Sequence, residues 1–214
     1  NCGANVTWTL DRDGVLTIRG TGPMGNLNEV NPSYTWYDKA KVLSVVIEPG
    51  VTSIGYMAFN GCSRLTSVTI PDSVTSIGIH AFTDCRSLTG VTIPSSATSI
   101  GSRAFDGCRN LTSVAIPDGV KRIGEEAFRE CVNLTSVTIP GTLTNIEKQT
   151  FYGCTGLTDV TIKNGVRSIG EKAFWGCDSL TSVDIPDSLI SIGEMAFLSC
   201  GSLSNLTIPS GVTS

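Results

Sequence analysis

Charge and histidine are scarce in this sequence. Only 16% of its 214 residues are charged, below the ~25% usual in soluble globular domains, and the one histidine is His80. The net charge is −4 and no part of the chain is basic, so nucleic acid is an unfavourable partner. No apolar run approaches the ~20 residues that a membrane helix needs, so we expect no membrane insertion.

A strict internal repeat of 23 residues dominates the chain. The repeat includes every phenylalanine and all cysteines except Cys2: Phe59, Phe82, Phe105, Phe128, Phe151, Phe174 and Phe197, and Cys62, Cys85, Cys108, Cys131, Cys154, Cys177 and Cys200. Two isoleucine series keep the same step, one beginning at Ile47 and the other at Ile54. A single repeat cannot bury its own apolar face, whereas stacked repeats can, so the period predicts a solenoid.

The unit L-T-x-V-T-I-P-x-x-V-x-x-I-G-x-x-A-F-x-x-C-x-x predicts the path of one layer. "LTSVTI" alternates as a strand and ends at Pro71, which cannot donate to a ladder. "SVTSIG" supplies a second short apolar pair, and "IHAFTDC" is expected to be a helical turn or irregular segment. The predicted interior includes Phe82, Cys85, Phe105, Cys108, Phe128 and Cys131.

The first 41 residues do not follow the period and are expected to cap the solenoid, which then covers residues 42–214. Two alternating runs around Asp13-Gly14 predict a β-hairpin. The side chains expected to seal the first layer are Trp8, Leu10, Leu16, Ile18, Trp36 and Tyr37. The last unit stops at "IPSGVTS", so we expect truncation within a repeat, with end-to-end self-association through the open layer.

The repeat unit resembles the BspA-like leucine-rich repeat family, and "CGANVTWTLDRDGVLTIRGTG" looks like the N-terminal block found ahead of such repeats. The resemblance implies an α/β leucine-rich repeat solenoid, right-handed and β-rich, with two short strands and a helical turn per repeat and a β-hairpin cap. It also implies a secreted or cell-surface protein, usually bacterial, without shared catalytic residues. Three departures, Glu147, Thr150 and Lys163, are expected to roughen two neighbouring layers without changing the fold.

His80 and Cys85 lie close enough in sequence to suggest a nucleophile with its base. However, Cys85 is at the inward cysteine position, and the position of His80 accepts unrelated side chains, so we expect no catalytic pair. Stacked cysteines in parallel layers do not aim their Cβ atoms at each other as a disulfide requires. Without a C-x-x-C pair or a second histidine, a metal site is also disfavoured. The seven cysteines are therefore expected to pack as small apolar groups, with no cofactor, whereas Cys2 is assigned no partner.

Two outward columns are candidates for partner binding. One is a threonine column on the first strand, including Thr69, Thr92, Thr138 and Thr161, which could equally reflect strand propensity. The other follows the phenylalanine and ends in Tyr152, Trp175 and Leu198, which could form an exposed apolar patch. Alternatively, Trp175 folds back on its own repeat or meets further repeats.

These columns favour a non-enzymatic binding or adhesion module, with a glycan as a second class of ligand. The resemblance implies that the module is extracellular and recognises host or neighbouring-cell proteins or matrix. The alternative is a structural spacer in a larger surface protein, with no ligand of its own. No constellation of acid, base, nucleophile or metal ligands indicates an enzyme.

Overall fold

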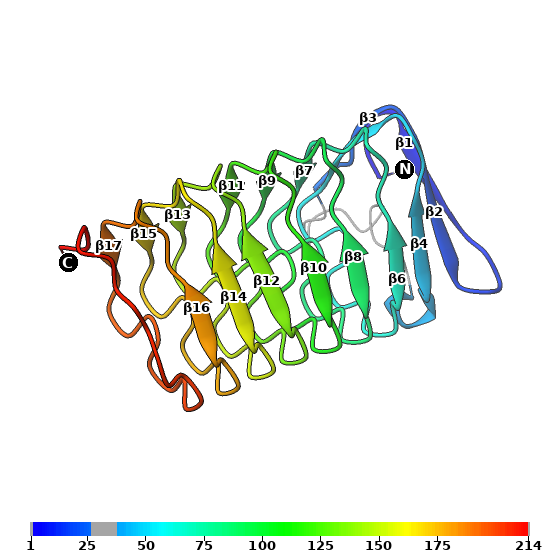
Figure 1. The fold of residues 1–214 in the computed structure, drawn as a ribbon. Helices are drawn as coiled ribbons and strands as arrows, with labels where there is room; N and C mark the ends of the chain where they lie inside the picture. Colours follow the sequence, from blue (N-terminus) through cyan, green and yellow to red (C-terminus); the bar gives the residue numbers. More distant parts are fainter. Residues whose placement is uncertain (1, 27–37, 214) are drawn as a thin grey trace.

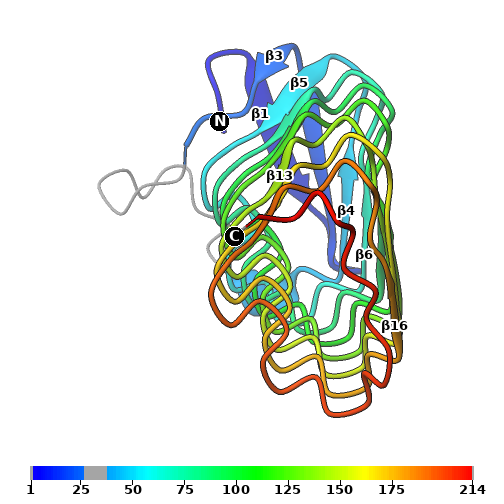
Figure 2. The same cartoon turned by 60° about the vertical axis from the view of Figure 1, so that its left-hand side comes forward.

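The computed structural model describes residues 2–26 and 38–213, which form an elongated β-solenoid (Figure 1). Successive repeats stack in a row from the hairpin near the N-terminus to the C-terminus, and the view in Figure 2 superposes their coils. Each repeat contributes one strand to each of two sides. The predicted solenoid of 23-residue turns is confirmed, since paired strands match residues 23 positions apart, as in Val137 and Val160.

The first side carries the longer strands: β4 (Ser44–Ile47), β6 (Ser67–Thr69), β8 (Gly90–Thr92), β10 (Ser113–Ala115), β12 (Ser136–Ile139), β14 (Asp159–Ile162) and β16 (Ser182–Asp184). The second side carries β5 (Val51–Ile54), β7 (Ser76–Ile77), β9 (Ser99–Ile100), β11 (Arg122–Ile123), β13 (Asn145–Ile146), β15 (Ser168–Ile169) and β17 (Ser191–Ile192). All strand pairs between repeats are parallel. The two sides are joined by turns. One of them begins at the repeated proline, as where Val74 N–H donates to Pro71 O at 3.0 Å.

The prediction of a helical turn in each repeat is wrong. The segment from Gly78 to Leu88 is a series of turns, because His80 and Asp84 have left-handed backbone angles, with φ of 57° and 58°. A left-handed residue interrupts the right-handed path of a helix. Successive N–H groups consequently alternate between acceptors in the same repeat and in the next repeat. Ala81 donates to the Gly78 carbonyl within the repeat at 3.3 Å, whereas Phe82 donates to the Ala104 carbonyl of the next repeat at 2.7 Å.

The predicted hairpin is present at one end of the solenoid. β1 (Val6–Leu10) and β2 (Val15–Gly20) are antiparallel, and β2 pairs in parallel with β4. This register places the fully buried Leu16 and Ile18 opposite Val45 and Ile47.

The rest of the N-terminal block completes this end of the molecule. It contains β3 (Gly22–Pro23), which pairs with β5, and the 3-10 helix η2 (Lys39–Lys41). Trp8 and Leu10 are half-buried against the core, whereas Trp36 and Tyr37 lie outside the described residues. The assignment of residues 1–41 as a separate capping unit remains a prediction.

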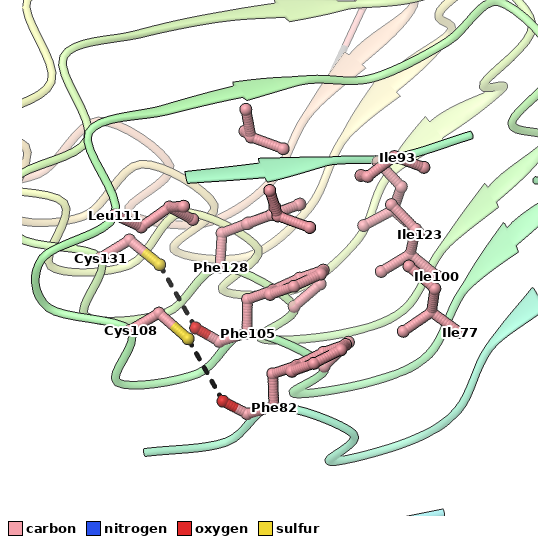
Figure 3. Close-up of a cluster of buried hydrophobic side chains, with 14 of the residues drawn as sticks. Ile77, Phe82, Ile93, Ile100, Phe105, Cys108, Leu111, Ile123, Phe128 and Cys131 are labelled. Carbon is pink, nitrogen blue, oxygen red and sulfur yellow. Dashed lines mark hydrogen bonds between the residues drawn. The ribbon is translucent and has the colours of Figure 1, made fainter. Parts of the chain in front are cut away.

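A continuous stack of phenylalanine rings forms the centre of the core (Figure 3). Neighbouring rings from Phe59 to Phe197 have centroids 5.1–5.5 Å apart. Beside them, cysteine thiols donate to phenylalanine carbonyls of the preceding repeat, as in Cys108 Sγ to Phe82 O at 3.2 Å. The core positions named from the sequence, from Phe82 to Cys131, are all 0% exposed. Each repeat therefore places the same core residues at the same positions as the repeat before it.

Each side is interrupted once: the first side between β6 and β8, and the second side between β11 and β13. The second side forms a five-stranded sheet from β3 to β11 and a separate three-stranded sheet from β13 to β17. Glu147, at the glycine position of the repeat, comes directly after β13. The irregular layer expected near Glu147 is thus a specific break in strand pairing, between β11 and β13.

Candidate functional site

His80 and Cys85 do not form a site. The Cys85 thiol is fully buried and donates to the Phe59 carbonyl at 3.2 Å. His80 is half-buried, and its Nδ1 lies 3.1 Å from the Thr83 hydroxyl. Because that hydroxyl donates to the Arg103 carbonyl at 2.7 Å, the histidine Nδ1 is assigned as the donor to Thr83. Burial and the nearby Arg103 lower the pKa of His80, so its neutral form is favoured.

The cysteines have the properties of core groups rather than reactive ones. All eight are free thiols, and Cys2 is buried without a disulfide partner. Burial raises the pKa of Cys154 to about 12 and that of Cys85 well above its usual value, so the reactive thiolate is suppressed. The described part of the chain contains no group of three or more His, Cys, Asp or Glu side chains placed to hold a metal ion.

The threonines divide into two structural classes. Thr66, Thr89, Thr112, Thr135, Thr158 and Thr181 each donate a side-chain hydroxyl to a carbonyl of the preceding repeat, at 2.9–3.4 Å. These hydroxyls hold layers together. The candidate residues Thr69, Thr92, Thr138 and Thr161 are exposed on β6, β8, β12 and β14. Ala115 and Asp184 interrupt this second column, so it is a mainly hydroxyl-bearing face with two breaks.

Tyr152 and Trp175 are brought together on the turn side of neighbouring repeats. Their rings stack with centroids 4.5 Å apart and planes at 12°. The guanidinium of Arg129, one repeat earlier, lies over the Tyr152 ring at 5.5 Å. Both aromatic residues are half-buried, whereas Leu198 at the end of the column is 50% exposed. We call Tyr152, Trp175 and Leu198 the edge patch.

A charged network continues the column toward the N-terminus. The Arg129 guanidinium lies 3.6 Å from the carboxylate of Asp106 and 3.7 Å from that of Glu126, and Arg103 lies 2.7 Å from Glu126. Burial raises the pKa of Asp106 to about 6, although Arg129 acts in the opposite direction. The position after each repeat phenylalanine therefore changes from polar and charged residues, ending at Arg129, to apolar and aromatic residues, beginning at Tyr152.

The sequence-based reading missed two parts of this surface. Met195 is a second exposed apolar residue in this repeat, 45% exposed, and its carbonyl accepts the Leu198 N–H at 3.1 Å. The second is Arg129, whose cation–π contact covers Tyr152. The column order contained a signal for Arg129, because it precedes Tyr152 by one repeat. The exposed threonine column lies on a different element of each repeat and does not join the edge patch.

No helix in residues 2–26 or 38–213 has the length and apolar character required to cross a membrane.

Solved structures of bacterial leucine-rich repeat proteins are similar to the chain. One from T. pallidum is 29% identical, with a TM-score of 0.65, over 83% of this chain and 88% of that protein. A leucine-rich repeat protein from Eubacterium ventriosum is 22% identical over 99% of this chain and 91% of its own, with a TM-score of 0.46. A leucine rich cell surface protein from Faecalibacterium prausnitzii is 24% identical over 99% and 83%, with a TM-score of 0.39.

No curated protein matches the chain. The family description "BspA type Leucine rich repeat region" matches residues 31–158 and 121–214, in six copies. These matches span the repeats whose stacking is described above and confirm the resemblance seen in the motif. The chain belongs to the BspA type leucine-rich repeat family.

Proposed function

We propose that this chain is a non-enzymatic binding module that acts outside the cell and contacts a protein partner through the edge patch. The observation that supports this role is the stacked pair Tyr152 and Trp175, followed in the same column by the exposed Leu198. Aromatic side chains that are partly exposed and held rigidly are typical anchors of protein interfaces. The stacking holds both rings in place before a partner arrives, which reduces the ordering cost of binding.

The arrangement of the rings favours a protein over a glycan. Two stacked rings have four faces, and two of these face each other. A third, on Tyr152, is covered by Arg129. A sugar that stacks on aromatic rings needs open faces, whereas a protein can pack against ring edges and the neighbouring Leu198 and Met195.

An extracellular location is part of the proposal and is supported by the family resemblance. The thiols are compatible with it, because oxidation requires accessible thiolates. Cys62 to Cys177 are buried, and burial raises their pKa values. An oxidising environment would therefore leave these thiols unpaired.

The test is a binding screen of the intact chain against immobilised matrix proteins, host-cell surfaces and a glycan array. A triple variant, Tyr152→Ser, Trp175→Ser and Leu198→Ser, is compared with a control triple variant on the strand face, Thr92→Ser, Thr138→Ser and Thr161→Ser. We expect the edge-patch variant to lose protein binding and the control to retain it. Equal binding by the edge-patch variant and the original chain would reject the edge patch as the contact surface. Absence of any ligand in the screen would favour the spacer role.

A further inference from the structure

The gap between β11 and β13 removes two backbone hydrogen bonds that recur along the second side. In the repeats that carry β7, β9, β11, β15 and β17, the residue before the short strand donates to its equivalent one layer earlier, as Arg167 N–H does to Thr144 O at 2.7 Å. The residue after the strand donates to an isoleucine carbonyl, as Gly170 N–H does to Ile146 O at 2.8 Å. Among the described residues, the corresponding Thr144 and Glu147 N–H groups have no such acceptor. Accordingly, β11 and β13 belong to separate sheets.

Glu147 provides a physical cause for the gap. Its equivalents in the other repeats are all glycine: Gly55, Gly78, Gly101, Gly124, Gly170 and Gly193. A Cβ atom on any of these glycines would lie only 2.1–2.7 Å from backbone of the preceding layer. Real Cβ atoms do not approach so closely, so the side chain at residue 147 forces its layer away from the Gly124–Glu125 backbone. A shallow hollow of about 260 Å³ lies at this junction and is lined by Lys121, Arg122, Ile123, Thr144, Asn145 and Glu147.

The other sides of the molecule remain connected at this level. In the turns, Glu126 N–H donates to Lys148 O at 3.0 Å and the phenylalanine stack continues from Phe128 to Phe151 at 5.5 Å. A side-chain bond from Thr142 Oγ1 to Val120 O, 2.7 Å long, spans the same junction. On the first side, β10 and β12 retain one matched residue pair, whereas β12 and β14 share four. The junction is therefore attached along the turns and weakened on both strand sides.

We propose that this junction is a built-in hinge at which the solenoid bends. The layers before β11 and those after β13 move as two stacks, the turns act as the axis, and the second side widens and narrows. Missing ladder bonds make local opening cheaper here than at any neighbouring layer. The Arg129–Tyr152 contact crosses the same junction on the turn side, close to the axis, so bending retains it. The hinge itself does not depend on the proposed binding role.

Residue-resolved amide hydrogen exchange tests the missing bonds. We expect the Thr144 and Glu147 amides to exchange at least ~10-fold faster than those of Arg167 and Gly170, their equivalents one repeat later. Glu147→Gly should restore the ladder and slow both amides. Glu194→Gly, at an exposed glutamate outside the glycine position, is the matched control and should change neither rate. Equal protection of Thr144 and Arg167 in the original chain would overturn the proposal.

Distance distributions between paired spin labels test the motion. The spin labels are attached to unnatural amino acids rather than to cysteines, because the eight native cysteines would compete for a thiol-reactive label. A pair at Thr98 and Thr144 spans the junction, whereas a pair at Thr144 and Ile190 spans the same number of repeats without a gap. We expect a broader distribution for the first pair, and Glu147→Gly should narrow it to that of the second. Distributions of equal width would show a static gap and reject the hinge.

Discussion

The indole ring of Trp175 lies against the phenol ring of Tyr152, with centroids 4.5 Å apart and planes inclined by 12°. Such pairs contribute about 0.5–1.5 kcal/mol beyond the area that they bury. We expect a double-mutant cycle of Tyr152→Ala and Trp175→Ala to give a coupling free energy of unfolding in that range. A parallel cycle of Tyr56→Ala and Trp175→Ala joins distant repeats and should give no coupling. A zero value in the first cycle would mean that the rings do not stack in solution.

The hydroxyl of Thr112 donates to Thr89 O at 3.1 Å, whereas the exposed Thr138 makes no such bond to its neighbouring layer. Thr112→Val should lower the free energy of unfolding by about 0.5–1.5 kcal/mol, because the hydrogen bond is lost while the side-chain shape is kept. Thr138→Val should change it by less than about 0.5 kcal/mol. Denaturant titration of both variants measures the difference. A larger loss for Thr138→Val would contradict the division of threonines into structural and free classes.

Asp106 should make stability depend on pH in an unusual direction. Its pKa is raised to about 6 by burial, from an ordinary value of 3.8. Between these values the folded state binds a proton that the unfolded state has released, so this group favours folding more as the pH falls from about 6 to 4. Asp106→Asn should therefore be up to about 2 kcal/mol more stable than the original chain at pH 7, with the difference disappearing near pH 4. Chemical denaturation at both pH values checks this, and an equal effect at both would argue against it.

The buried thiols should limit stability at high pH. Burial raises the pKa of Cys62 and Cys154 to about 12, from a reference value of 9.0. Their stabilising contribution is complete below pH 9 and is lost as the pH rises through the interval up to the folded-state value, because the unfolded chain ionises first. We expect the denaturation midpoint to fall steadily above pH 9. A double variant, Cys62→Ala and Cys154→Ala, should show a shallower fall despite lower stability at pH 7, and a fall of equal slope would contradict the assignment.

Most of the fold follows from the period alone. Phe82 and Cys85 recur at fixed steps with other apolar residues, so the repeat alone distinguishes inward from outward positions. The backbone angle of His80 was not predictable in this way. Its column contains six different residue types in seven repeats and no glycine, and the left-handed conformation is imposed by hydrogen bonds to the next layer. Local preference was thus overridden by contacts 22 residues away, such as His80 N–H to Ser102 O.

The candidate surface was only partly predictable. The sequence placed Tyr152, Trp175 and Leu198 in one column, but whether two rings stack or turn away depends on side-chain torsions that a column does not specify. Glu147 was visible as a departure from glycine. Its effect depends on the distance between a Cβ atom at this position and the backbone of the preceding layer, which the period does not specify. The binding role of the exposed threonines remains a prediction.

The phenylalanine stack also sets a rule for changes in chain length. Each ring rests on the ring 23 residues away, so deletion of one whole repeat would let Phe105 meet Phe151 in the geometry that now joins Phe105 to Phe128. Loss of a single residue would instead shift every later side chain out of its row. Insertions and deletions in the repeated part of this protein are therefore tolerated as whole layers, and its reach can be shortened or extended only in steps of one layer.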